Sequence, residues 1–191
     1  MALEPSIAVF DACILYPFHL RNILVQAAVD RLVEARWTDA IHEEWIRNLA
    51  ANAPAIPIER LEITRRLMND ALPRALIIGY EELIPRITLP DPNDRHVVAA
   101  AIISDATLVL TWNLRHFPAT ELKRFGLRRM TPDAFLSKLF DKVPYLVIGS
   151  LANARQNLSK ARISASEFVG ILENQKLVQL AKRVEKYAAE L

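Results

Sequence analysis

The sequence predicts an α/β fold: a three-layer α/β/α sandwich with a central parallel sheet, followed by a C-terminal α-helical extension. Short apolar runs rich in branched residues, at 6–10 and 107–111, have the length and composition of buried strands. Segments with helical periodicity alternate with these runs, which favours a parallel sheet covered on both faces. From Val143 onward only helical patterns occur, so we divide the chain into a domain at 1–141 and an extension at 142–191.

The composition favours a globular protein of the cytoplasm. The chain has 191 residues, 52% of them hydrophobic, which is enough for a sizeable core. Its single cysteine excludes an internal disulfide framework and fits a reducing compartment. The N-terminal residues do not resemble a signal peptide, and no apolar stretch approaches the ~20 residues that span a bilayer. The net charge of +2 identifies no partner by itself.

The first half of the chain is predicted to contain one strand and three helices. Asp11 ends the strand, and Pro17 suits the first turn of the following helix. Trp37-Thr38 is predicted as a strand remnant, and Asp39 as the N-cap of the next helix. The predicted elements are a strand at 6–10 and helices at 17–34, 40–51 and 59–72.

The second half is predicted to alternate helices with strands. The segment 79–88 is predicted as a loop with a short strand, and the composition of 89–94 is typical of a turn. Thr131 and Pro132 are expected to cap and begin a helix. The further elements are helices at 95–104 and 131–140 and strands at 107–111 and 127–130.

The extension is predicted to contain three helices, at 143–158, 164–173 and 177–191. Ser164 and Glu167 have the spacing of a capping box at the start of the second helix. We expect the extension either to pack on the body of the protein or to contact another chain, including a second copy.

Four acidic residues lie at the edges of apolar segments and are scattered along the chain: Asp11, Glu44, Asp91 and Asp94. Asp11 and Asn113 each come just after the last apolar residue of a strand, and parallel sheets bind ligands beyond the carboxyl ends of their strands. Carboxylates ~4 Å apart repel one another by roughly 1 kcal/mol in water and about 4 kcal/mol at an effective dielectric constant of 20. A fold that gathers them must protonate some or bind a cation, and oxygen ligands suit Mg²⁺ or Mn²⁺.

Each acid also has an ordinary explanation on its own. Asp11 could simply end a strand, and Glu44 could lie on a solvated helix face. Asp91 could belong to a turn, and Asp94 could cap a helix. The four acids together, rather than any one of them, indicate a cation site.

These residues lie in segments that resemble a PIN domain, the nuclease fold found in VapC-type toxins. The matching segments are Ile7-Ala-Val-Phe-Asp11, Ala40-Ile-His-Glu-Glu44-Trp, Leu89-Pro-Asp91-Pro-Asn-Asp94-Arg-His and Leu108-Val-Leu-Thr-Trp-Asn113. The resemblance covers roughly residues 5–140. Its most specific part is the Asp-Pro-Asn-Asp-Arg-His segment, which leads into an alanine-rich helix.

The resemblance implies an endoribonuclease that depends on Mg²⁺ or Mn²⁺ and hydrolyses phosphodiester bonds of single-stranded RNA. Asp11 and Asp94 would hold the ion, with Glu44 and Asp91 as further metal-binding acids. Glu44 would also orient or deprotonate the attacking water, and Asn113 would fix the water network. The residues expected to act in catalysis are therefore Asp11, Glu44, Asp94 and Asn113.

The resemblance also implies partners and one alternative. The protein would be the toxin of a toxin–antitoxin pair, with RNA as substrate and a cognate antitoxin as protein partner. Separately, the helical extension could form a homodimer, and the lack of a long apolar stretch predicts no membrane association. Asn113 stands where many family members have an aspartate, so the site has one charge fewer than usual. The alternative is therefore a catalytically weak or inactive RNA-binding or scaffold protein on the same fold.

Thr111, Arg115 and His116 are predicted to contact the substrate. Thr111 could instead hydrogen-bond a ligand acid or be an ordinary strand residue. The basic stretch after Asn113 could give salt-dependent contacts to RNA phosphates, or it could be a solvated rim. This stretch contains Arg115, His116, Lys123, Arg124, Arg128 and Arg129. Cys13 is expected to be a packing residue rather than a reactive thiol.

Overall fold

A four-stranded parallel sheet forms the centre of the protein. The structure is a computed structural model that describes residues 4–158 and 161–191. The sheet has the strand order β2-β1-β3-β4, and Ala8 of β1 pairs with Ala35 on one side and Leu108 on the other. The strands are β1 (Ser6–Phe10), β2 (Val33–Arg36), β3 (Leu108–Leu110) and β4 (Arg128–Met130). Because all strands are parallel, their carboxyl ends meet at one edge of the sheet.

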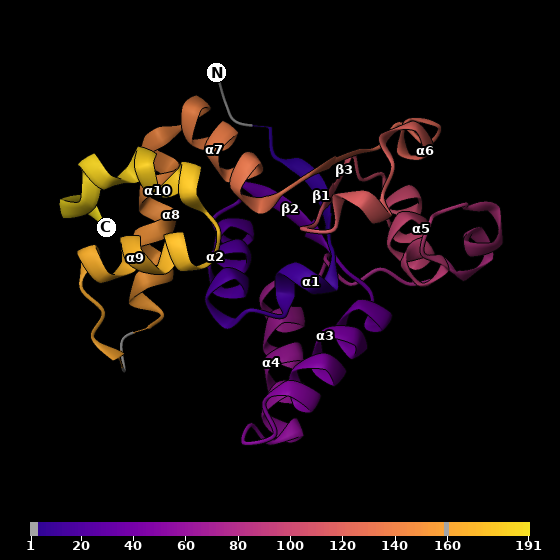
Figure 1. The fold of residues 1–191 in the computed structure, drawn as a ribbon, viewed down its shortest axis with the longest axis horizontal. Helices are drawn as coiled ribbons and strands as arrows, with labels where there is room; N and C mark the ends of the chain where they lie inside the picture. The colour runs from indigo at the N-terminus through magenta and orange to yellow at the C-terminus, as the bar shows by residue number, and fades with distance from the viewer. Residues whose placement is uncertain (1–3, 159–160) are drawn as a thin grey trace.

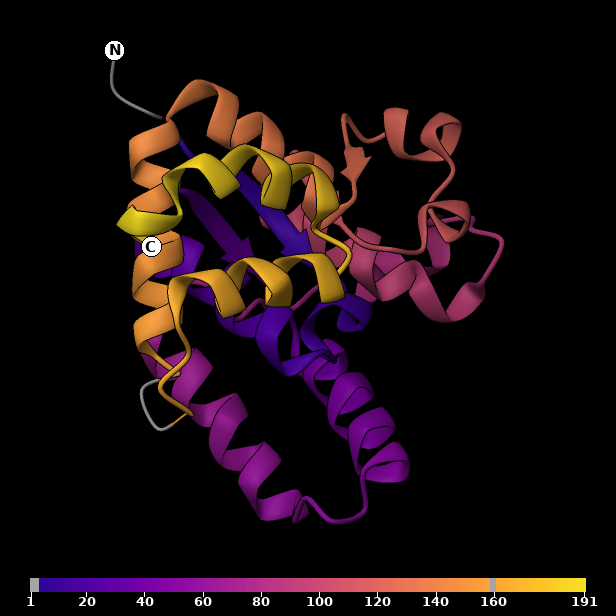
Figure 2. The same ribbon diagram turned by 60° about the vertical axis from the view of Figure 1, so that its left-hand side comes forward.

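Helices cover both faces of this sheet, which confirms the predicted three-layer architecture. The helices α2, α7 and α8 lie on one side and α5 on the other, while α3 and α4 project together as a hairpin (Figures 1 and 2). The α-helices are α1 (Ala12–Leu15), α2 (Phe18–Val29), α3 (Asp39–Asn52), α4 (Ile58–Ala71), α5 (Arg95–Ile103), α6 (Ala119–Lys123), α7 (Pro132–Lys142), α8 (Pro144–Gln156), α9 (Ala165–Asn174) and α10 (Val178–Val184). Shorter 3₁₀ turns are η1 (Glu81–Arg86), η2 (Pro92–Asp94), η3 (Leu114–His116) and η5 (Glu185–Glu190).

The second strand lies where the sequence predicted the end of a helix. Helix α2 ends at Val29, and Arg31 adopts a left-handed conformation with φ of 60°, which no helix continues. Val33 and Ala35 then turn inward while Glu34 faces solvent, which is the alternation of a strand. The prediction that the helix continues to Glu34 was therefore wrong.

The start of α3 also differs from the prediction by one residue. The N-cap is Thr38, whose hydroxyl accepts a hydrogen bond from the Ile41 N–H at 3.2 Å, and not Asp39. Trp37 forms an isolated bridge with Leu76 rather than belonging to a longer strand. The threonine hydroxyl can cap the helix because the extended backbone that leaves β2 aims it at the first helical turn.

The segment 79–88, predicted as a loop with a short strand, contains the 3₁₀ turn η1 instead. Pro85 lies inside this turn, and a proline cannot donate the hydrogen bond that a sheet strand requires. The turn packs against α5 and does not extend the sheet.

A buried network of aromatic residues fixes α3 against α4 and the sheet. The Trp37 indole N–H donates to Asn69 Oδ1 at 2.8 Å, and the Trp45 indole N–H donates to His42 Nδ1 at 3.0 Å. His42 Nε2 completes the network at 3.2 Å from Asn69 Oδ1. Burial lowers the pKa of His42 to about 4, so this histidine is neutral. Because Glu44 belongs to the same helix, the network also positions that acid.

The helical extension packs on the body through α8, which contacts α2 and α7. The Asn22 side chain donates to the Ala154 carbonyl at 2.7 Å, and the buried Asp133 accepts from the N–H groups of Gln179 and Leu180 at 3.1 and 3.0 Å. The predicted capping box at the start of α9 is present. The domain boundary after residue 141 stays a prediction. Across residues 4–158 and 161–191, every helix is too short or too polar to cross a bilayer.

Candidate active site

The fold brings the four predicted acids together at the carboxyl edge of the sheet. Asp11 follows β1, Glu44 lies on α3, and Asp94 ends η2 just before α5. Burial, followed by the negative charges of Asp11, Asp94 and Asp91, raises the pKa of Glu44 to about 7. Since such charge effects weaken with distance, these carboxylates are close neighbours in the folded chain.

Asp11 is held at the bottom of this cluster by two donors. Its side chain is almost completely buried, with the residue 2% exposed. The Thr111 hydroxyl donates to Oδ2 at 2.6 Å, and the Cys13 thiol donates to the same oxygen at 2.9 Å. Within the described part of the chain, Oδ1 receives no hydrogen bond, so it is available to a ligand. Thr111 is thus the partner of an acid and is itself buried.

Cys13 is a hydrogen-bond donor that sequence reasoning did not identify. Its sulfur also accepts from the Trp112 N–H at 3.3 Å, which ties the chain after β3 to the chain after β1. Burial, followed by the nearby charge of Asp11, raises the pKa of this thiol far above its usual range. Cys13 therefore remains protonated, as a donor requires, and the two-residue spacing from Asp11 was the available signal.

Two of the acids form a tighter group of possible ligands with a histidine. Asp91, Asp94 and His116 each offer an atom within 4.8 Å of the other two, and Asp11 and Glu44 lie outside this tight group. His116 Nδ1 is hydrogen-bonded to Asp94 Oδ2 at 2.7 Å. Burial raises the pKa of Asp94, and the bond to His116 opposes that rise.

His96 is a further neighbour of the acids that the predicted set did not include. Its Nε2 lies 3.9 Å from Glu44 Oε2, too far for a hydrogen bond, and its side chain is 15% exposed. Burial lowers the pKa of His96, while the charge of Asp11 opposes that shift. Its position two residues after Asp94 was the signal that could have placed it here.

The remaining predicted residues, Asn113 and Arg115, lie at the surface in the segment that follows β3. Asn113 is exposed, and its backbone N–H donates to the Thr111 hydroxyl at 2.9 Å. Arg115 is also exposed and forms no ion pair with any described residue. Arg129, from the same basic stretch, instead donates to the carbonyls of Leu114 and Phe117 and so braces the turn η3.

The donor set at this edge suits a hard divalent cation. It consists of carboxylate oxygens with one imidazole, and burial, followed by repulsion from the neighbouring acids, raises the pKa of Glu44. A cation would relieve that repulsion, which is the physical reason to expect one at this position.

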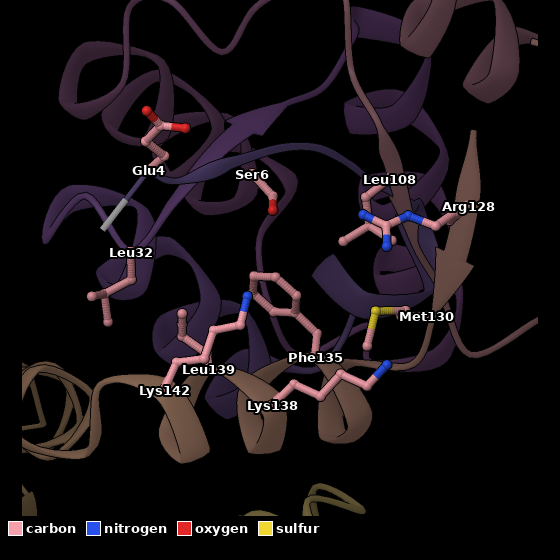
Figure 3. Close-up of a pocket in the computed structure, with 10 residues that line it drawn as sticks. All are labelled: Glu4, Ser6, Leu32, Leu108, Arg128, Met130, Phe135, Lys138, Leu139 and Lys142. Carbon is pink, nitrogen blue, oxygen red and sulfur yellow. The ribbon is translucent and has the colours of Figure 1, made fainter. Parts of the chain in front are cut away.

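A separate cavity of about 130 Å³ lies at the opposite edge of the sheet (Figure 3). Ser6, Leu108 and Arg128 line it, and each is the first residue of its strand. Lys138 and Lys142 of α7 extend beside it. Because the strands are parallel, this cavity and the acids lie at opposite ends of the strands, so the cavity is not part of the candidate active site.

Two comparisons with known proteins find relatives of this chain. The family model described as the VapC50 C-terminal domain matches residues 132–186. The protein named "Putative ribonuclease VapC50" of Mycobacterium tuberculosis is 38% identical over 72 residues, which cover 38% of this chain and 42% of that relative. The match therefore spans less than half of the relative's length. No solved structure matches the chain significantly.

The family match covers the four helices from α7 to α10, and the parallel sheet has the architecture that the PIN resemblance implied. The 38% identity to the mycobacterial protein supports a similarity to the same kind of protein. The chain is therefore similar to VapC-type proteins over these two matched stretches.

Proposed function

We propose that this protein is a metal-dependent endoribonuclease that hydrolyses single-stranded RNA, and that it acts as the toxin of a toxin–antitoxin pair. The observation that carries the proposal is the convergence of Asp11, Glu44 and Asp94 from three distant segments on one edge of the sheet. The name of the similar mycobacterial protein, a ribonuclease, supports the same activity.

The proposed roles follow from the position of each side chain. Asp11 and Asp94 would hold Mg²⁺ or Mn²⁺, with Asp91 as a further ligand, and the ion would stabilise charge on the phosphate. Glu44 would accept a proton from the attacking water, because a pKa near 7 suits a general base at neutral pH.

The buried and exposed neighbours would support these steps. Thr111 and Cys13 would keep Asp11 in one orientation through their hydrogen bonds to Oδ2. Asn113 would orient water at the rim. Arg115, which is exposed and precedes His116 in the chain, would contact an RNA phosphate as a sequence-independent cation.

Cleavage of a labelled single-stranded RNA by the purified protein tests the activity. We expect cleavage with Mg²⁺ or Mn²⁺, and its loss in EDTA or in Asp11→Asn. Asp105→Asn is the matched control, because it removes the same charge at the other edge of the sheet, before β3. Its left-handed φ of 53° is one that asparagine tolerates. Cleavage that survives Asp11→Asn would contradict the assignment.

The exposed, uncharged Asn113 favours the second candidate, an RNA-binding protein without activity. RNA binding that persists in EDTA without any cleavage under either metal would support that candidate. The proposed toxin role is tested in cells: expression of the wild type should stop growth, and expression of Asp11→Asn should not.

A further inference from the structure

The turn after β3 presents a nitrogen donor to the acids. Asn113, at the position where the family resemblance places an aspartate, is exposed and carries no charge. Three residues later, His116 reaches Asp94 with Nδ1 2.7 Å from Oδ2. The residue that approaches the acids from this turn is therefore an imidazole.

The backbone around His116 is anchored from both sides. The His116 N–H donates to the Asn113 carbonyl at 2.9 Å, which closes η3. Arg129 donates to the carbonyls of Leu114 and Phe117, which flank His116, and the Phe117 ring is fully buried. The imidazole thus projects from a fixed turn, as a preorganised ligand does.

The atoms of this group have the spacing of ligands around one ion. Asp91 Oδ1 accepts from the Asn93 N–H at 2.9 Å, and Oδ2 is left without a donor from the described residues. Two adjacent ligands of an octahedral cation, each roughly 2.1 Å from it, lie about 3 Å apart. The 2.7 Å between His116 Nδ1 and Asp94 Oδ2 is close to that spacing. All three groups lie within 4.8 Å of one another, slightly more than the roughly 4.2 Å between opposite ligands, so a small shift would bring them around one ion.

We propose that His116 supplies a nitrogen ligand to a divalent cation held by Asp91 and Asp94, and that this ligand makes the site favour Mn²⁺ over Mg²⁺. The inference rests on the proposed metal-dependent nuclease and specifies its ion. Mg²⁺ prefers oxygen ligands, whereas imidazole binds transition metals, so a nitrogen ligand helps Mn²⁺ more than Mg²⁺. His116 is then a metal ligand rather than a contact to RNA.

Pulsed electron paramagnetic resonance of the full chain loaded with Mn²⁺ tests this directly, because it detects nitrogen bound to the ion. We expect a nitrogen coupling in the wild type, a change of that coupling with isotope-labelled histidine, and its loss in His116→Gln. His96→Gln, which alters the other histidine near the acids, is the matched control and should keep the coupling. Competition between the two metals should show that His116→Gln weakens Mn²⁺ binding at least ~10-fold and Mg²⁺ binding less.

Each other outcome overturns the inference. Bound Mn²⁺ without nitrogen coupling, or coupling that persists in His116→Gln, would exclude His116 as a ligand. If RNA is still cleaved in a metal-dependent way in those samples, the nuclease proposal survives and only the role of His116 fails. A protein that binds no divalent cation would remove both. If His116→Gln does not fold, coupling from labelled histidine in His96→Gln decides the question instead.

Discussion

The Glu44 carboxylate is half-buried on α3 and faces three other acids. Removal from water is the largest cause of the rise in its pKa to about 7, and the charge of Asp11 is the next cause. Arg47, on the same helix, opposes the rise but does not cancel it. At neutral pH Glu44 of the metal-free protein is therefore close to half protonated. A bound cation would remove the unfavourable environment of its charged form, and this gain in free energy favours cation binding.

This electrostatic strain predicts how Glu44→Gln changes stability with pH in EDTA. The pKa of Glu44 is about 7 in the folded protein and near its ordinary value of 4.5 in the unfolded chain. Between these pH values the folded state holds a proton that the unfolded state has lost, so rising pH destabilises the wild type. The variant lacks this penalty and should gain on the order of 1 kcal/mol relative to wild type by pH 8, after allowance for solvent screening.

Urea unfolding of both proteins at pH 4.5 and pH 8 measures this difference. Glu43→Gln, at an exposed position of the same helix, is the control and should show no such pH-dependent gain. A Glu44→Gln variant whose advantage is equal at both pH values would show that the carboxylate is not strained.

The position of the site could be predicted from single residues, but its detailed contacts could not. Asp11 and Asn113 follow strands, and the rule that parallel sheets bind ligands at their carboxyl ends places them together. The donor role of Cys13 depends on how α1 turns immediately after Asp11, and the contact of His116 depends on η3. No hydrophobic pattern reveals turns of three or four residues.

At the scale of elements, the long helices were predictable and the short strand β2 was not. Apolar spacing fits a helix throughout α2 and gives no sign of its end, because Leu32 and Val33 continue the apolar pattern. The helix ends because Arg31 adopts a left-handed backbone conformation. An arginine at that position gives no sequence signal for such a conformation, whereas a glycine would. By contrast, Thr131 and Ser164 cap α7 and α9 as predicted, since their hydroxyls satisfy N–H groups of the first turn.

One contact between elements predicts the stability of the extension. Asp133 on α7 accepts from two N–H groups of α10, so Asp133→Ala leaves both unpaired, with that of Leu180 in a buried position and that of Gln179 in a partly buried one. We expect a loss of about 1–2 kcal/mol, the cost of removing a helix cap. Thermal unfolding measures the loss, and hydrogen exchange should speed up within residues 178–184.

The control for this change is Asp141→Ala, also on α7. Asp141 pairs with Arg183 of α10, at 2.9 and 3.0 Å, but at the surface. Exposed ion pairs contribute little, so this variant should unfold close to the wild-type temperature. Equal effects of the two variants would show that the buried cap has no special role.

At the scale of the whole molecule, the extension is part of the core. Val147, Ile148 and Leu151 of α8 are buried, and the helix packs against α2 and α7. Removal of residues 143–191 would expose those faces of α2 and α7 to water. We therefore expect the truncated chain to aggregate, because large exposed apolar faces associate.

Size-exclusion chromatography of the truncated chain measures this outcome. Tyr145→Ser, which alters a side chain of α8 that is 73% exposed, is the control and should remain as soluble as the wild type. A soluble truncated monomer with intact helical content would show that residues 1–142 fold alone, and it would support the predicted domain boundary.

The three tryptophans give the molecule separate optical reporters. Trp37 and Trp45 are sealed within the network around His42, so their emission follows folding of the body. Trp112 is half-buried, and its backbone N–H donates to the Cys13 sulfur, which in turn donates to Asp11. A paramagnetic ion bound at the acids should therefore quench the emission of Trp112 and not that of the other two. Replacing Trp112 with Phe would separate the two signals and leave every acid in place.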